Sequence, residues 1–304
     1  MTPERLIEGH RIGIATATRY PNWQGGETRP DDETSTDKIR GDLALETIKA
    51  ALNNGYQIVV VDGGSSEAFV EAVRALGVTI QEEEERGMSA GRRQAFRAVS
   101  GLEGVDVVCW TEPEKVSFVQ DCITEDVLRA FDDGADIVVP RRNEEAFASY
   151  PDYQADFERE SNRVWNDILR RHGLLVEDAP DLDAWIGPRI IRNDPKILEM
   201  FMHEREFVSE IQSGLKQDAP GLWPDALFLP LIEALYRGLK IVGVDVPYAH
   251  PKKQTANEQD SEEFRKKRAA QQENILKVTI FFIHYLENER RGRLGKLSGI
   301  RQVK

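Results

Sequence analysis

The chain has 304 residues, of which 40% are hydrophobic, so it can fill the core of one large domain or of a domain with an extension. Its 53 acidic and 40 basic residues give a formal net charge of −13, which argues against nucleic acid or an anionic membrane as a general partner. Two cysteines, Cys109 and Cys122, are too few for a disulfide framework, so we expect a reducing, cytoplasmic setting. Neither residues 1–10 nor the apolar stretch 275–286 has the character of a signal peptide or a membrane span.

The first half of the chain alternates between short apolar runs and segments with helical periodicity. We expect strands at 11–17, 58–61, 78–81, 105–110 and 137–139, helices at 43–52, 67–76, 89–99 and 125–131, and a long polar loop over 20–42. Strands that alternate with helices of this length predict right-handed βαβ units. The fold class is therefore α/β, with a mostly parallel sheet flanked by helices.

The second half is less regular. Helices are expected at 153–171, 196–202, 207–215 and 226–237, strands at 184–192 and 240–246, and a long charged helix at 261–291. The last helix carries an apolar stripe, and the sequence leaves open whether this stripe packs on its own domain or mediates a homodimer. We divide the chain into a domain at 1–255, with halves at about 11–140 and 141–255, and a C-terminal helical extension at 256–304.

Polar residues follow each of the first four strands. In an open parallel sheet, ligands bind outside the carboxyl ends of the strands, at the point where the strand order reverses. The candidate ligand-binding residues at these ends are Thr16, Thr18 and Arg19, then Asp62, Gly63 and Ser65, then Ser89 and Arg92, and finally Glu112, Glu114 and Lys115.

Two of these ends suit a nucleotide. Asp62 can accept hydrogen bonds from a pyrimidine base, and the small residues after it allow a ligand to approach the backbone closely. The hydroxyl of Ser89 can cap a helix whose free N–H groups, with Arg92, face an anion. The alternatives are a tight turn capped by Asp62 and Ser65, and a solvated basic face around Arg92.

The order and spacing of these segments resemble family 2-type GT-A glycosyltransferases over residues 11–140. The matching segments are Asp62-Gly63-Gly64-Ser65-Ser66, Gly87-Met88-Ser89-Ala90-Gly91-Arg92 and Glu112-Pro113-Glu114. The resemblance implies a GT-A fold and a nucleoside diphosphate sugar as donor. It also implies that Asp62 contacts the base and that Arg92 lies near the nucleotide.

The pair Glu112 and Glu114 stands where the family usually carries Asp-x-Asp. Transfer from a nucleoside diphosphate sugar requires the charge of the departing diphosphate to be neutralised, and carboxylates can hold Mg²⁺ or Mn²⁺ for this purpose. The longer glutamates and the intervening Pro113 alter the geometry, and Lys115 offers a cation that could offset part of the diphosphate charge. The alternative for both glutamates is a surface or helix-start carboxylate.

The resemblance also implies roles for residues in the second half. His250 is similar to the C-terminal histidine that supplies a further metal ligand in many GT-A enzymes, although it could equally be a loop residue. Asp225 stands where inverting members carry an acid that deprotonates the acceptor, with helix capping as its alternative and Asp183 as a second candidate base. The sequence does not decide between inversion and retention.

We therefore expect a glycosyltransferase, of hexosyltransferase type, that acts on a small-molecule or soluble glycan acceptor. Two alternatives remain open. A scaffold protein that kept the fold without catalysis is compatible with the Glu-x-Glu departure. A sugar-1-phosphate nucleotidyltransferase is less compatible, because residues 16–19 lack the glycine-rich basic loop of that class.

Overall fold

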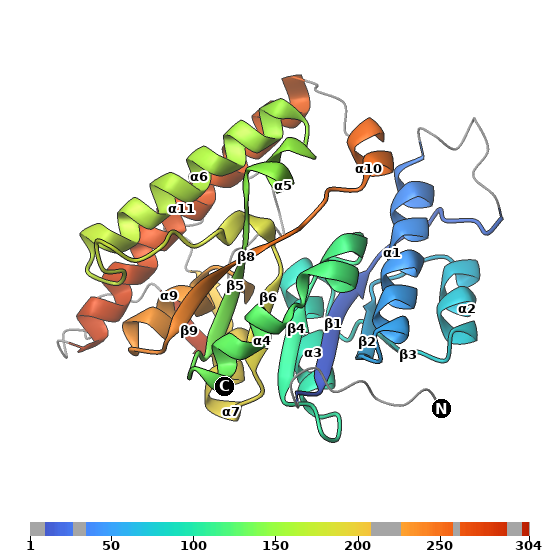
Figure 1. Ribbon diagram of the computed structural model, residues 1–304, viewed down its shortest axis with the longest axis horizontal. Helices are drawn as coiled ribbons and strands as arrows, with labels where there is room; N and C mark the ends of the chain where they lie inside the picture. The colour runs from blue at the N-terminus through green and yellow to red at the C-terminus, as the bar shows by residue number, and fades with distance from the viewer. Residues whose placement is uncertain (1–9, 27–34, 208–225, 258–261, 291–299, 304) are drawn as a thin grey trace.

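The computed structural model describes residues 10–26, 35–207, 226–257, 262–290 and 300–303 (Figure 1). The strands are β1 (Ile12–Thr18), β2 (Gln57–Asp62), β3 (Thr79–Glu82), β4 (Val107–Trp110), β5 (Ile137–Arg142), β6 (Arg189–Arg192), β7 (Glu204–Phe207), β8 (Ile241–Val246) and β9 (Ile300–Val303). The helices are α1 (Thr36–Asn53), α2 (Glu67–Ala75), α3 (Met88–Ser100), α4 (Glu125–Asp132), α5 (Glu144–Ala148), α6 (Asp152–Arg171), α7 (Pro195–Met202), α9 (Leu229–Tyr236), α10 (Lys252–Asn257) and α11 (Glu262–Arg290), with short turns η2 (Phe118–Cys122) and η3 (Ala184–Ile186).

The main sheet has seven strands in the order β3-β2-β1-β4-β6-β5-β8. All neighbouring pairs are parallel except those of β6, which runs antiparallel to both β4 and β5. The chain moves from β1 outward through β2 and β3 and then returns to the other side of β1 with β4. The strand order thus reverses beside β1, and the carboxyl ends of β1, β2 and β4 meet there. The predicted α/β fold with a mostly parallel sheet is confirmed.

Both faces of the sheet are covered by helices, because successive strand residues point to opposite sides. Ile14, Val60 and Cys109 pack with α1, α2 and α4 in one core. Ala15 and Val108 pack on the other face with α3, α6, α7, α9 and α11. The apolar run 58–61 of β2 and the apolar β4 follow from this double burial.

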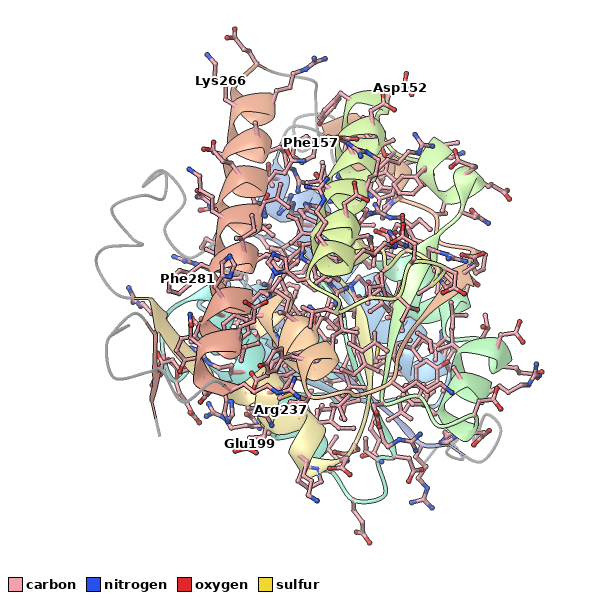
Figure 2. The ribbon with its side chains drawn as sticks, turned by 90° about the vertical axis from the view of Figure 1, so that its left-hand side faces the viewer. Asp152, Phe157, Glu199, Arg237, Lys266 and Phe281 are labelled. Carbon is pink, nitrogen blue, oxygen red and sulfur yellow. The ribbon has the colours of Figure 1, made fainter. Side chains whose placement is uncertain are left out.

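The long helix α11 belongs to the second core. Its stripe residues Val278 and Phe282 are buried, and Thr279 Oγ1 accepts a hydrogen bond of 3.2 Å from Trp165 Nε1 of α6. Figure 2 shows α6 and α11 lying side by side along one flank. The stripe of α11 thus packs on its own domain, and a homodimer stays a prediction.

Three expected elements differ in the structure. Helix α1 begins at Thr36, inside the expected loop. The sequence pattern did not indicate this start, because the buried position 38 carries a lysine, whose ammonium donates to Asp42 Oδ1 at 2.8 Å. The expected strand at 184–192 is broken by Gly187, whose φ of +95° separates the turn η3 from β6. The expected helix at 207–215 lies outside the described residues except for its first residue, which ends β7. No helix in the described part of the chain is long and apolar enough to cross a membrane.

Candidate active site

A cleft of about 500 Å³ lies over the carboxyl ends of β1, β2 and β4, where the strand order reverses. We call it the strand-end cleft. Helix α1 and the start of α3 form its sides. Its lining includes Thr18, Arg19, Tyr20, Asp37, Arg40, Gly63, Glu83, Gly87, Met88, Gly91, Arg92, Trp110, Glu112, Pro113 and Glu114.

The turn after β2 is held by Asp62. Its Oδ1 accepts from Thr18 Oγ1 at 2.8 Å, and its Oδ2 accepts from the backbone N–H groups of Gly64 at 3.1 Å and Ser65 at 2.9 Å. Ser65 Oγ in turn accepts from the backbone N–H of Tyr20 at 2.8 Å, which ties the turn to the segment after β1. Gly63 borders the strand-end cleft, whereas Asp62 and Ser65 border a smaller hollow beside it. The structure thus shows Asp62 in the turn-capping arrangement, and its contact with a base stays a prediction.

The start of α3 brings one of its two predicted residues to the cleft. Gly87 occupies the cap position with φ +142°, and no side chain caps the helix, so Ser89 is not the cap that we expected. Arg92 lines the cleft, and its guanidinium lies 5.4 Å from the ring centre of Trp110. Ser89 is outside the lining, as is Thr16, whose hydroxyl donates to Thr111 O at 2.9 Å between β1 and β4.

The two glutamates after β4 both line the cleft, but their surroundings differ. Glu112 packs directly on Gly187, where a β-carbon would lie 2.3 and 2.4 Å from the carboxylate oxygens. Its Oε2 is buried and has no hydrogen-bond partner among the described residues. A buried carboxylate oxygen without a partner is costly, and a cation would relieve that cost. Glu112 therefore fits a hard divalent ion.

Glu114 is already engaged. Its Oε1 accepts from the hydroxyl of Tyr20 at 2.9 Å. Burial raises the pKa of Glu114 above its usual value, and the nearby Arg40 and the Tyr20 hydrogen bond offset only part of this effect. The second carboxylate is thus a less ready metal ligand than the first.

Lys115 and His250 lie outside the lining of the cleft. The Lys115 ammonium is 4.8 Å from the ring centre of Tyr248. Burial lowers the pKa of Lys115, but electrostatic interactions with Tyr150 and Glu112 outweigh this effect and raise it. The buried His250 ring stacks on Tyr150 with centroids 4.2 Å apart. Lys115 is therefore a counter-charge beside Glu112, and the ligand role of His250 stays a prediction.

Asp183 sits in a buried ion network. Its carboxylate accepts from Arg142 Nε at 2.7 Å, from Arg142 Nη2 at 2.8 Å and from Asn162 Nδ2 at 2.6 Å. Burial raises the pKa of Asp183, but the Arg142 charge and hydrogen bonds outweigh it and hold that pKa below its usual value. With both oxygens occupied, the structure does not support Asp183 as the base. Asp225 lies outside the described residues.

Two buried arginines shape this region, and the predictions from the sequence did not include the first of them, Arg142. Arg142 ends β5 and also binds Glu158 of α6, and a search of the later strand ends would have singled it out. The guanidinium of Arg189 donates to Ala184 O at 2.6 Å and Pro188 O at 2.7 Å, which holds the chain around Gly187. Desolvation lowers the pKa of Arg189 to about 10.

A sheet that reverses its order beside β1, with a cleft over that point and a carboxylate with an unsatisfied oxygen at its edge, is the arrangement of an α/β protein that binds its ligand at the strand ends. The family model described as glycosyl transferase family 2 matches residues 39–192, which is 154 of the 304 residues. The chain belongs to this family.

Solved structures show the same fold at low sequence identity. Glucosyl-3-phosphoglycerate synthase from Mycobacterium tuberculosis, in complex with Mn²⁺, uridine diphosphate and phosphoglyceric acid, is 14% identical with a TM-score of 0.50, covering 91% of this chain and 81% of that one. The same enzyme with phosphoglyceric acid alone gives 14% identity and a TM-score of 0.50, covering 92% and 82%. No curated protein sequence matches the chain.

Proposed function

We propose that this enzyme transfers a sugar from a nucleoside diphosphate sugar to a small or soluble acceptor, with a divalent metal ion held at Glu112. The observation that carries the proposal is the buried Oε2 of Glu112, which borders the strand-end cleft and has no partner among the described residues. A bound Mg²⁺ or Mn²⁺ would supply positive charge to the departing diphosphate. The similar solved structure with Mn²⁺ and uridine diphosphate makes a uridine diphosphate sugar the first donor to test.

The chain's own residues divide the remaining work. Arg19 and Arg92 line the cleft and provide cations for the diphosphate oxygens. Gly63 and Gly87 line it without side chains, which lets the donor approach the backbone. Tyr20 fixes Glu114, so Glu114 shapes the wall of the cleft more than it binds metal. Lys115 balances the charge of Glu112 from the interior.

The acceptor side is proposed from the buried network around Arg142. Asp183 and Glu158 hold this guanidinium, and its position over the rings of Phe147 and Tyr150, at 4.4 and 5.0 Å, leaves it little freedom. Asp183 thus acts as a positioning residue. Asp225 remains the proposed base if the reaction inverts configuration.

Calorimetry with UDP-glucose, with and without Mn²⁺, tests the proposal. We expect Mn²⁺-dependent binding that Glu112→Gln weakens at least about tenfold. The matched control Glu71→Gln, at an exposed position on α2, should bind like the wild type. Failure of every nucleotide sugar to bind would contradict the proposal, and binding without hydrolysis or transfer across broad acceptor panels would indicate a scaffold.

A further inference from the structure

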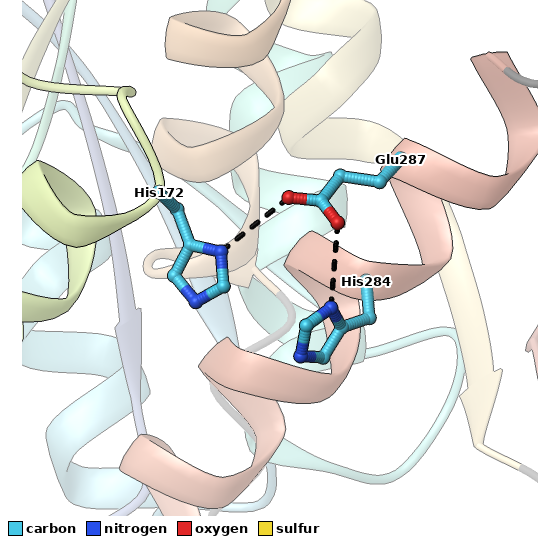
Figure 3. Close-up of side chains that lie close together, drawn as sticks. All are labelled: His172, His284 and Glu287. Atoms are coloured by element: carbon cyan, nitrogen blue, oxygen red, sulfur yellow. Dashed lines mark hydrogen bonds and ion pairs between the residues drawn. The ribbon is translucent and has the colours of Figure 1, made fainter.

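A second cluster of metal-ligating side chains lies where the end of α6 meets α11 (Figure 3). His172 is the residue after the last turn of α6, and His284 and Glu287 lie three residues apart on α11. Residues three apart share one face of a helix, so both side chains of α11 point toward His172. None of the three residues borders the strand-end cleft.

The carboxylate of Glu287 lies between the two imidazole rings. His172 Nδ1 is 3.4 Å from Oε1, and His284 Nδ1 is 3.4 Å from Oε2. Ligand atoms around a tetrahedral zinc ion are about 3.3–3.5 Å apart, because each lies about 2.0–2.2 Å from the metal. Each N···O separation has this length, with one oxygen of the Glu287 carboxylate facing each ring.

The two rings need only a small movement to complete such a site. Candidate ligand atoms of the three residues all lie within 4.8 Å of one another, and the ring centroids are 5.2 Å apart. At most about 1.5 Å must therefore close to reach tetrahedral spacing. The side chain of His284 is 55% exposed, so its ring can rotate by this amount without disturbing the core.

Hydrogen bonds alone satisfy this cluster poorly. Ordinary N–H···O bonds are about 2.7–3.2 Å long, so both contacts of Glu287 are at the weak end. A carboxylate is an acceptor when ionised, so Glu287 offers both of its oxygens to a cation.

The donor set selects the class of ion. Two imidazole nitrogens with one carboxylate suit Zn²⁺ and its late first-row neighbours, whereas Mg²⁺ prefers oxygen ligands. The side chains of His172 and Glu287 are 22% and 30% exposed, which leaves room for water as a fourth ligand. We propose that His172, His284 and Glu287 bind a zinc-class transition-metal ion that clamps the end of α6 to α11.

Cobalt provides a test that does not depend on transfer activity. Four-coordinate Co²⁺ with nitrogen and oxygen ligands absorbs visible light, and Zn²⁺ should displace it from the same site. We expect the wild-type protein to take up one Co²⁺ with these bands. Glu112→Gln should behave identically, because the proposed donor-site metal lies elsewhere.

Ligand and control variants decide the assignment. His284→Asn and Glu287→Gln should lose the bands and bind Zn²⁺ at least about tenfold more weakly, with circular dichroism unchanged. His203→Asn is the matched control. His203 Nε2 lies 3.1 Å from Glu199 Oε1 in an i, i+4 pair, and no third candidate ligand joins this pair among the described residues. Absence of bands in the wild type, or bands that persist in both ligand variants, would overturn the proposal.

Discussion

Gly187→Ala should separate the geometry of Glu112 from the general stability of the fold. Gly187 has φ +95°, and a β-carbon there would lie 2.3 Å from one carboxylate oxygen of Glu112 and 2.4 Å from the other. The positive φ alone should cost about 1–2 kcal/mol. The contact adds to this cost, because Glu112 must withdraw by about 1 Å to reach van der Waals distance.

The matched control is Gly134→Ala. Gly134 has φ +86°, and a β-carbon there would meet no atom within 4 Å. Both variants should therefore lose stability, with Tm lower by about 1.5 °C for each kcal/mol. Only Gly187→Ala should also lose transfer, by about 100-fold, since a displacement of about 1 Å in a site can cost that much.

Thermal unfolding and a donor-turnover assay on both variants, with excess Mn²⁺, make this comparison. If Gly187→Ala turned over donor at the rate of Gly134→Ala, then Glu112 would not need its observed position, and the reasoning would be refuted.

Three further predictions concern groups around the cleft. Tyr20→Phe leaves Glu114 Oε1 without its donor and should cost about 1–3 kcal/mol in urea unfolding; an unchanged midpoint would contradict this. The folded-state pKa of Glu114 is raised, so the protonated carboxyl stabilises the folded state at a pH below the unfolded pKa. This contribution to the free energy of unfolding is lost as the pH rises through the folded pKa. Glu114→Gln should therefore flatten the fall in Tm with rising pH above its ordinary pKa of 4.5, and an unaltered profile would count against the assignment. Asp183→Asn should cost about 3–5 kcal/mol by leaving Arg142 partly unpaired, measured by the same unfolding assay; a loss no larger than that of the exposed control Glu160→Gln would contradict it.

Local sequence pattern was enough to predict most of the sheet. The apolar runs that became β2 and β4 are buried on both faces, so their composition reports their position directly. The antiparallel direction of β6 could not be predicted in this way, because it depends on which strands it joins in space. The early start of α1 was missed because a paired lysine replaces an apolar residue in the buried face.

The sequence could predict which residues follow the strands and so lie near the candidate site. It could not predict which of these residues contact one another or residues from distant parts of the chain. Glu112 was found because it follows an apolar strand, whereas its contact with Gly187 joins residues 75 positions apart. Asp183 was expected to be a second candidate base if the reaction inverts configuration. Its partner Arg142 is 41 residues away in the chain, and only the fold shows that the pair is buried together.

The most direct test of a divalent metal ion held at Glu112 is the UDP-dependent binding of Mn²⁺. The binding is measured through the electron paramagnetic resonance signal of the free ion. We expect the wild type to remove free Mn²⁺ from solution when UDP is present, and Glu112→Gln to do so at least about tenfold more weakly. Equal UDP-dependent uptake by the wild type and Glu112→Gln would contradict the placement of the metal at Glu112.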